Sequence, residues 1–443
     1  MKGQKKRRFS AAQVIISSFI GLISCGTILL MLPFATKDGS GAHFIDALFT
    51  ATSASCVTGL IVQDTASYWS GFGHVVILLM IQVGGLGVVT MALAISMLSG
   101  KRIGIRQRST MQEAISAPRV GGVVRLTGFI LKGTAVFEVS GAVLLAPVFI
   151  GRFGLWRGIW YSIFHSISAF CNAGFDLMGI EEPFSSLTSF KDNAWVVFVV
   201  TALIIIGGIG FLVWDDVSTY KLKLRKYRMQ SKVVLTTSAI LLVVPTVLLF
   251  FLEYPEGSAM HRLSLAWFQS VTTRTAGFNT ADLTLLSEAG MALFIVLMLI
   301  GGSPGSTAGG MKTSTFAVLI SNMRSIFLRK EDTQFFGRRI ERGTVRSAAT
   351  IATLYIVLFL TGGCVISRIE GLPLMTCLFE TASAVGTVGV TMGITPALGT
   401  ASRLIIILLM YLGRVGSLTL IFAAVSSQQT SLSKYPVEKI TVG

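Results

Sequence analysis

Four short segments of this chain carry a pattern that suits the coordination of a small cation by backbone carbonyl groups. Each segment contains a glycine, and a phenylalanine precedes it by ten residues in three segments and by nine in the third. The glycines recur at intervals of 115, 103 and 112 residues, which indicates four diverged copies of one unit. Turns arranged around one axis can replace the water shell of an ion, so ion permeation is the leading hypothesis. The segments read FTATSASCVTGL, FHSISAFCNAGF, WFQSVTTRTAGF and FETASAVGTVGV, with glycines Gly59, Gly174, Gly277 and Gly389.

The glycines supply the backbone freedom that such a site needs. Glycine adopts positive φ without steric cost, so the preceding carbonyl groups can turn toward the axis. A pore helix should end at each turn and present the negative end of its dipole to a cation. We expect these helices near 44–56, 159–171, 262–273 and 374–385. Six acids either concentrate cations at the outer mouth or lie on solvated loops: Asp46, Asp64, Asp176, Glu181, Glu182 and Asp192.

The composition places these turns in a membrane. The chain is 52% hydrophobic and only 13% charged, whereas a soluble protein carries about 25% charged residues. A membrane helix needs about 20 apolar residues. The first apolar stretch follows a basic tail, and we interpret it as an uncleaved membrane helix rather than a signal peptide. Eight stretches qualify: 12–32, 72–99, 126–150, 194–214, 232–252, 289–320, 347–367 and 402–426.

The predicted fold is an all-α polytopic membrane protein with four helix–re-entrant pore loop–helix repeats around a central pore, which gives eight transmembrane helices. Four ordinary extracellular loops would not explain the recurring phenylalanine-to-glycine spacing. Irregular backbone at membrane depth is tolerated where protein buries it or water lines it. The predicted segments are a tail 1–11, repeats 12–100, 126–215, 232–326 and 346–426, linkers 101–125, 216–231 and 327–345, and a tail 427–443.

The basic residues predict the orientation. Of the 37 Lys and Arg residues, most lie in the two tails and three linkers, and Arg274 is among the few assigned to the opposite side. By the positive-inside rule both termini are cytoplasmic and the glycine segments enter from outside. The net charge of +16 then faces an anionic leaflet or an acidic partner, and no nucleic-acid-binding signature accompanies it.

The expected inner helices repeat a second glycine pattern. It reads Gly84-Gly85-Leu86-Gly87 and Gly207-Gly208-Ile209-Gly210 in the first two copies, where close helix packing accounts for it. The third copy reads GGSPGSTAGGMKT over 301–313, and no straight helix survives that composition. We expect a mobile gate loop beneath the turns. A phosphate-binding loop is excluded because Met311 separates Gly310 from Lys312. The gate residues are Gly301, Gly302, Ser303, Pro304, Gly305, Ser306, Thr307, Gly309, Gly310, Lys312 and Thr313.

Arg414 stands in the fourth copy of this pattern, where the others have glycine. An arginine at membrane depth is costly and needs a cavity or a partner. Two alternatives remain: Arg414 faces the pore as a positive barrier, or it forms a buried ion pair with Glu138 or Glu380. The five cysteines show neither metal-site spacing nor a disulfide framework; Cys171, three residues before Gly174, should lie near the pore.

With these features the chain resembles the KtrB-type membrane subunits of Ktr potassium uptake systems, within the Trk/Ktr/HKT superfamily. The resemblance rests on the four glycine segments, the 301–313 stretch and Arg414. It implies a K+ pathway in a multi-pass protein of the bacterial plasma membrane, a homodimer, and a cytoplasmic RCK-type (KtrA-like) ring that binds ATP or ADP. It also implies Na+ stimulation in some members, and no cofactor in this chain. The implied filter is Val57, Thr58, Gly59, Asn172, Ala173, Gly174, Thr275, Ala276, Gly277, Thr387, Val388 and Gly389.

Two transport mechanisms remain open from the sequence. A gated, channel-like potassium uptake pathway comes first. A sodium- or proton-coupled symporter of the same fold is the alternative, with Glu380 as the candidate site for the second ion. An enzyme is excluded because no paired acids, nucleophile–base arrangement or metal cluster appears.

Overall fold

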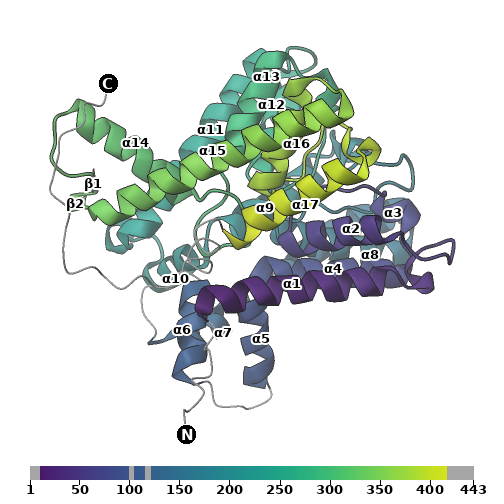
Figure 1. Ribbon diagram of the computed structural model, residues 1–443, viewed down its shortest axis with the longest axis horizontal. Helices are drawn as coiled ribbons and strands as arrows, with labels where there is room; N and C mark the ends of the chain where they lie inside the picture. Colours follow the sequence, from purple (N-terminus) through teal and green to yellow (C-terminus); the bar gives the residue numbers. More distant parts are fainter. Residues whose placement is uncertain (1–9, 99–103, 115–120, 417–443) are drawn as a thin grey trace, which may run out of the picture.

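Four long helices frame the molecule, one in each repeat. In the computed structural model, which describes residues 10–98, 104–114 and 121–416, each of these helices is long and apolar enough to cross a membrane. Six spans result when two bent pairs of helices are also counted. Three of the long helices extend slightly beyond the predicted stretches, whereas α1 ends at Leu30, before the predicted end of 12–32. They are labelled in Figure 1: α1 (Ala11–Leu30), α7 (Val123–Phe153), α11 (Met229–Leu252) and α15 (Arg342–Glu370).

A shorter pore helix follows each long helix and ends at the glycine turn. The second and third begin earlier than predicted, for local reasons. Gly154, with φ of +79°, ends α7 and lets α8 start at once, and the Ser258 hydroxyl caps the third by accepting a hydrogen bond from the His261 amide. The four are α2 (Phe44–Cys56), α8 (Leu155–Phe170), α12 (Ala259–Thr272) and α16 (Leu374–Gly386).

The inner helices are broken, which corrects the prediction of uninterrupted helices over 72–99 and 194–214. A bend of 99° separates α4 (Gly71–Leu86) from α5 (Val88–Leu98), and one of 96° separates α9 (Ala194–Gly208) from α10 (Phe211–Tyr220). In the third repeat α13 (Glu288–Leu299) and α14 (Thr313–Phe327) flank the predicted break. In the fourth, α17 (Thr400–Val415) stops at Gly416, and residues 417–426 of the predicted helix lie outside the described residues.

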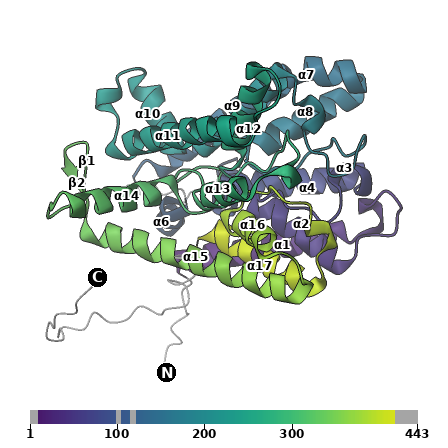
Figure 2. The ribbon, with the colours of Figure 1, turned by 90° about the horizontal axis from the view of Figure 1, so that it is seen from above.

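The repeats close into a ring through one recurring contact, in which each inner helix packs on the pore helix of the next repeat. Thus α4 packs on α8, α9 on α12 and α13 on α16, and α17 closes the ring by packing on α2. Figure 2 shows α16, α17 and α2 grouped on one side of the molecule and α8, α9 and α12 on the other. The glycine turns are therefore held by contacts both within and between repeats.

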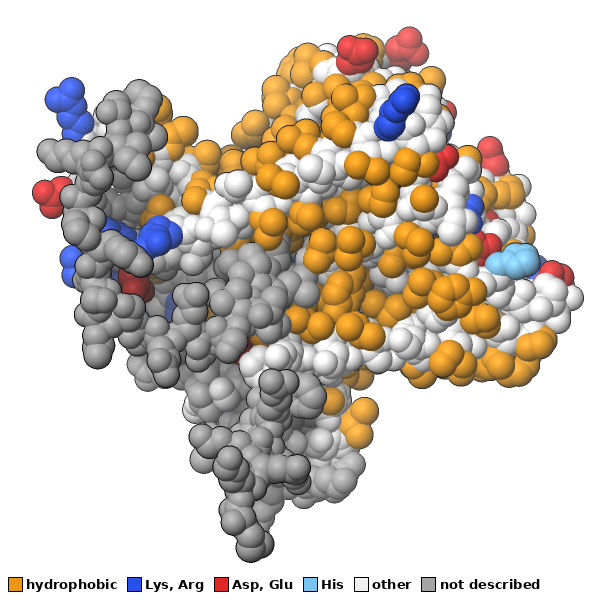
Figure 3. Space-filling model, viewed as in Figure 1, with side chains coloured by type: hydrophobic (Ala, Val, Ile, Leu, Met, Phe, Trp, Pro, Cys, Tyr) orange, Lys and Arg blue, Asp and Glu red, His pale blue; other side chains and the backbone are white. Residues whose placement is uncertain are grey.

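The remaining elements lie at the two ends of the bundle. Charged side chains visible in Figure 3 gather at those ends, and hydrophobic ones cover the face between them, as expected of a membrane protein. At the end that carries α5, α6 (Ile105–Ala114) and α10, strands β1 (Gln334–Phe335) and β2 (Arg338–Arg339) pair antiparallel. The other short helices are α3 (Thr65–Tyr68), η1 (Pro33–Ala35), η2 (Thr188–Phe190), η3 (Leu224–Lys226), η4 (Leu283–Leu285) and η5 (Thr395–Ala397).

Candidate functional site

The four glycine turns share one backbone conformation. Each glycine has positive φ, between 71° and 95°. The residue two positions earlier is also left-handed in every turn, with φ of 56°, 58°, 69° and 51° for Val57, Asn172, Thr275 and Thr387. Three of these residues are β-branched, for which positive φ is a genuine outlier. Such strain costs about 1–3 kcal/mol per residue and persists where the surrounding structure enforces it, which is typical of functional sites.

The turns form a closed ring, because each glycine lies against a carbonyl oxygen of the next repeat. A Cβ atom added to Gly59 would lie 2.7 Å from the Ala173 oxygen, and one added to Gly174 would lie 2.8 Å from the Ala276 oxygen. The series continues from Gly277 to Val388 at 2.8 Å and from Gly389 to Thr58 at 2.0 Å. No side chain fits at any of the four positions, so the ring brings together the glycines and the residues before them.

A hydroxyl residue four positions after each phenylalanine anchors each turn. The hydroxyls of Ser53 and Ser383 accept hydrogen bonds from the Gly59 and Gly389 amides at 3.1 and 3.0 Å. In the middle repeats Ser168 and Thr272 instead donate to the carbonyl groups just after the glycine. The four phenylalanines, Phe49, Phe164, Phe268 and Phe379, are fully buried. This serine or threonine is visible in every sequence segment, but reasoning from the glycine spacing alone missed it.

Several polar groups of the turns have no partner in the described part of the chain. The buried hydroxyls of Thr58, Thr275 and Thr387 and the Asn172 amide nitrogen lack a hydrogen bond there. Since buried polar groups are normally satisfied by protein, water or a ligand, the ring leaves polar capacity for water and ions. Across the described residues no cluster of His, Cys, Asp and Glu side chains could hold a metal ion, and all five cysteines are free.

Most of the six outer acids contact protein groups and do not lie free in solvent. Asp46 is buried and pairs with Arg403 at 2.6 Å, while Asp64 caps α3 and accepts from the Phe184 amide. Burial raises the pKa of Asp176, two residues past Gly174, to about 7. Glu181 pairs with Arg152, and Asp192 with His261. Their proposed effect on cations at the mouth stays a prediction.

The stretch between α13 and α14 is a loop that closes at its base. The Gly301 amide donates to the Met311 oxygen at 2.8 Å, and the Thr313 amide donates to the Gly302 oxygen at 3.0 Å. The Lys312 ammonium donates to two carbonyl groups inside the loop, those of Ala308 and Gly309. Residues 301–312 thus form an ordered loop with a hydrogen-bonded base, and we call them the inner loop.

The inner loop packs directly against the glycine ring. The Thr307 hydroxyl lies 3.0 Å from both the Phe170 carbonyl and the Asn172 side-chain oxygen. A Cβ atom added to Gly309 would lie 2.0 Å from the Thr387 hydroxyl. The loop also binds the second inner helix, since the Ser303 and Thr307 amides donate to the Gly208 and Gly207 oxygens. It therefore touches the turns of the second and fourth repeats at once.

Arg414 holds the inner loop from the opposite side. Its guanidinium donates to the Thr307 carbonyl and to the carbonyls of Gly84 and Gly85. The alternative of an ion pair with Glu138 or Glu380 is wrong for the described residues. The Glu138 carboxylate meets Gln82 and Cys171 instead, and Glu380 accepts from Thr391, Thr395 and the Met392 amide. Arg414 thereby links the loop to the first inner helix by carbonyl contacts alone.

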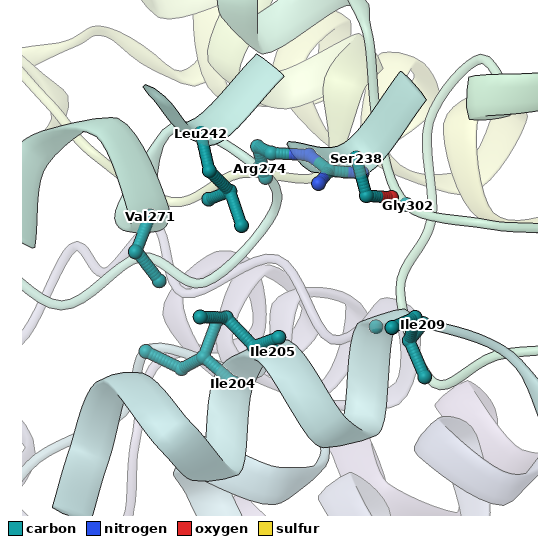
Figure 4. Close-up of a pocket in the computed structure, with 9 residues that line it drawn as sticks. Ile204, Ile205, Ile209, Ser238, Leu242, Val271, Arg274 and Gly302 are labelled. Atoms are coloured by element: carbon teal, nitrogen blue, oxygen red, sulfur yellow. The ribbon is translucent and has the colours of Figure 1, made fainter. Parts of the chain in front are cut away.

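Arg274 was assigned to the outer side by its position in the sequence, and this was wrong. Its guanidinium lies 3.1 Å from the Thr313 hydroxyl, at the start of α14. Figure 4 shows Arg274 beside Ser238, with Leu242, Val271 and Gly302 around a small cavity of about 20 Å³. That volume admits a water molecule, and neither the Arg274 Nε nor the Ser238 hydroxyl has a hydrogen-bond partner in the described residues. The error arose because a long side chain after a pore helix can reach inward.

Fold and site together define a polytopic membrane protein with a fourfold backbone ring and a loop that covers one face of it. A family model described as TrkH, cation transport protein, matches residues 2–435. The chain belongs to this family, so it is a transport protein and not an enzyme. Its polytopic membrane location follows from the same fold.

Individual members with known names are similar to this chain over nearly its whole length, which agrees with the family assignment. The chain is 41% identical to the potassium/sodium uptake protein NtpJ of Enterococcus hirae, over 100% of this chain and 99% of the relative. It is 36% identical to the Ktr system potassium uptake protein B of Bacillus subtilis, over 98% and 97%. The crystal structure of the potassium transporter TrkH from Vibrio parahaemolyticus matches with a TM-score of 0.74 at 18% identity, over 95% of this chain and 86% of that one. The resemblance to KtrB-type proteins is confirmed, and the structural match supports the fold.

Proposed function

We propose that this chain is the membrane subunit of a potassium uptake system and that K+ passes through the glycine ring. The observation that carries the proposal is the closure of the ring, in which each glycine lies against the carbonyl that precedes the glycine of the next repeat. Four pore helices end there, each with about half a negative charge at its C-terminus. Carbonyl groups in this arrangement can replace the hydration shell of K+. The relatives named above as potassium uptake proteins support this choice of ion.

The inner loop and Arg414 are the proposed gate. The loop lies against the turns of two repeats and is held by hydrogen bonds that water could replace. Its glycines have many accessible backbone conformations, so a second position costs little. Displacement would release the Thr307 contacts to α8 and the Arg414 contact together. The proposed filter and gate are thus in direct contact, through Asn172 and Thr307.

A cytoplasmic partner is proposed to move the gate. The relative from Bacillus subtilis is named as protein B of a Ktr system, which suggests that further subunits exist. We propose an RCK-type ring, similar to KtrA, that binds ATP or ADP and docks on the basic end of a homodimer in the bacterial plasma membrane. Both termini would then be cytoplasmic. Nucleotide should act only through the ring.

Coupling to sodium is the second candidate, favoured by the NtpJ relative, whose name includes sodium. Glu380 is the residue to test, because its buried carboxylate lies in the fourth pore helix. However, both of its oxygens already accept hydrogen bonds from Thr391, Thr395 and the Met392 amide. A carboxylate satisfied in this way favours a structural role and hence the uncoupled pathway.

Ion flux into liposomes tests the proposal. With the partner ring and ATP present, K+ flux should follow the K+ gradient and reverse with it, without any Na+ gradient. Flux that requires a Na+ or proton gradient would support the coupled alternative. The absence of K+ flux from a correctly sized, partner-bound protein would overturn the proposed function.

A further inference from the structure

A groove of about 700 Å³ lies between α11 and α14, away from the pore. Its walls are largely apolar and include Ile240 on α11 and Phe316 and Ile320 on α14. Two of these side chains face outward, because Ile240 is 54% and Ile320 is 44% exposed. One wall of this apolar groove is therefore a helix long and apolar enough to cross a membrane, α11.

A basic pocket of about 330 Å³ adjoins the groove where α11 begins. No acidic residue lines it. Of its cations, Arg228 is already paired with Asp215 and Asp216, and the others form no ion pair within the described ranges. The cations without an ion pair in those ranges are Arg225, Lys226, Lys232 and Arg338, and the Lys232 ammonium donates a hydrogen bond to the Arg225 carbonyl. The pocket therefore offers positive charge that no protein group in the described structure neutralises.

The apolar groove and the basic pocket lie along the same face of α11 and share one residue of the hairpin. Lys232 lines the pocket, and Thr236 and Ile240 line the groove. Residues four and eight positions apart lie on one helix face, so these three form one stripe. Phe336, at the turn between β1 and β2, lines both sites. A ligand with a charged end and an apolar chain could occupy the two together.

We propose that an anionic phospholipid binds here, with its phosphate headgroup in the basic pocket and an acyl chain in the apolar groove. Basic pockets between membrane helices suit acidic headgroups, and the apolar groove gives the chain a place that a soluble anion does not need. This site is independent of the ion pathway. It reaches α14, whose first residue, Thr313, closes the base of the inner loop, so bound lipid would restrain that base.

Native mass spectrometry of the purified full-length protein tests the site, with phosphatidylglycerol and phosphatidylcholine added at equal concentration. We expect preferential retention of phosphatidylglycerol. Each Lys or Arg near an acidic headgroup contributes about fivefold to binding, so Lys226→Gln with Arg338→Gln should weaken phosphatidylglycerol binding about 25-fold. The matched control is Arg342→Gln with Arg346→Gln, two exposed arginines of α15 that line neither site.

A second variant separates the two halves of the site. Ile320→Trp fills the apolar groove without changing charge and should also reduce phosphatidylglycerol binding. Glycerol phosphate, which has a headgroup but no chain, should compete weakly. Equal retention of both lipids, an unchanged affinity in the Lys226/Arg338 variant, or competition by glycerol phosphate as strong as by whole lipid would overturn the proposal. The proposal would also be overturned if Ile320→Trp dissociated the dimer and left phosphatidylglycerol binding unchanged. That result would show that a second copy of the chain occupies the groove.

Discussion

In the glycine ring the four repeats have the same backbone, whereas in the layer directly beneath it the third repeat differs from the others. The first, second and fourth inner helices are interrupted at Gly87, Gly210 and Gly416, with nearly identical φ of 87°, 99° and 88° and ψ of 132°, 138° and 128°. The equivalent position of the third repeat is Pro304. Proline cannot adopt positive φ, so the hinge is not available there and the chain forms the inner loop.

The first glycine of each inner-helix motif shows the same difference. Added Cβ atoms on Gly84, Gly207 and Gly413 would lie 2.0, 1.9 and 2.2 Å from carbonyl oxygens at the end of their own pore helix. On Gly301 the nearest atom is instead the Gly309 oxygen, 2.4 Å away, within the inner loop. The inner loop has thus taken the place of a direct helix contact. A symmetric layer suits ion selection, and one asymmetric repeat beneath it provides a single part that can move.

The largest effect should come from breaking the symmetric layer. In Gly389→Ser the added side chain would displace the Thr58 carbonyl, which is 2.0 Å from the Cβ position. We expect K+ flux in liposomes to fall by about 100-fold, equivalent to about 2.7 kcal/mol of lost ion stabilisation. Gly59→Ser, Gly174→Ser and Gly277→Ser should act alike. The control is Gly21→Ser, where nothing lies within 4 Å; full flux in any of the four ring variants would remove that glycine from the filter.

Removing most of the inner loop should raise K+ flux, whereas the ring variants lower it. Deletion of residues 303–310 spares the residues that close the base of the loop, Gly301 and Met311, but removes the segment that packs against the ring. We expect partner-free K+ flux to rise about tenfold, a change of about 1.4 kcal/mol, with little further gain from ATP and the ring. Expression and oligomer size are measured first. A correctly assembled variant with unchanged or lost flux would indicate a structural hinge instead of a gate.

A smaller effect is expected from loosening the inner loop without shortening it. Arg414→Gln loses the charge-assisted bonds to the Thr307, Gly84 and Gly85 carbonyls. Partner-free flux should rise about fivefold, equivalent to about 1 kcal/mol. Arg414→Lys keeps the charge but not the planar set of donors, so it should lie between wild type and Arg414→Gln. Equal flux in all three proteins would show that Arg414 does not hold the gate.

The smallest effect is expected for the thermal stability of variants at two of the glycine hinges, Gly87 and Gly210. Gly87→Ala and Gly210→Ala both place an alanine at positive φ in a region that glycine favours, which costs about 1–3 kcal/mol. At Gly210 the new Cβ would also lie 2.9 Å from the Pro304 carbonyl, whereas at Gly87 the nearest atom is 3.7 Å away. The additional strain should lower the free energy of unfolding of Gly210→Ala by about 1 kcal/mol more than that of Gly87→Ala. Thermal unfolding in detergent should therefore show a lower Tm for Gly210→Ala than for Gly87→Ala. Identical Tm values would mean that the inner loop yields freely at this contact.

The sequence was sufficient to predict the repeats, the turns and the break in the third inner helix, because glycine and proline act through local backbone chemistry. It was insufficient for the hinges at Gly87 and Gly210, since a glycine in an apolar helix is equally consistent with close packing, which also occurs at Gly84 and Gly207. The left-handed conformations of Val57, Thr275 and Thr387 could not be predicted from the sequence, because these residue types favour extended backbone. The partners of Arg414 are carbonyl groups, which every residue has, so no residue type could reveal them.

The contact between α17 and α2 also bears on how the protein is made. Synthesis proceeds from the N-terminus, and domains that emerge first can fold first. Here the first turn cannot be completed early, because the neighbour on one side of Gly59 is Gly389, which belongs to the last repeat. Until α17 is inserted, α2 lacks its packing partner and the Thr58 carbonyl lacks the glycine that faces it. A nascent chain with only three repeats in the bilayer therefore has an incomplete ring, and nearly the whole polypeptide must be synthesised before the ring can close.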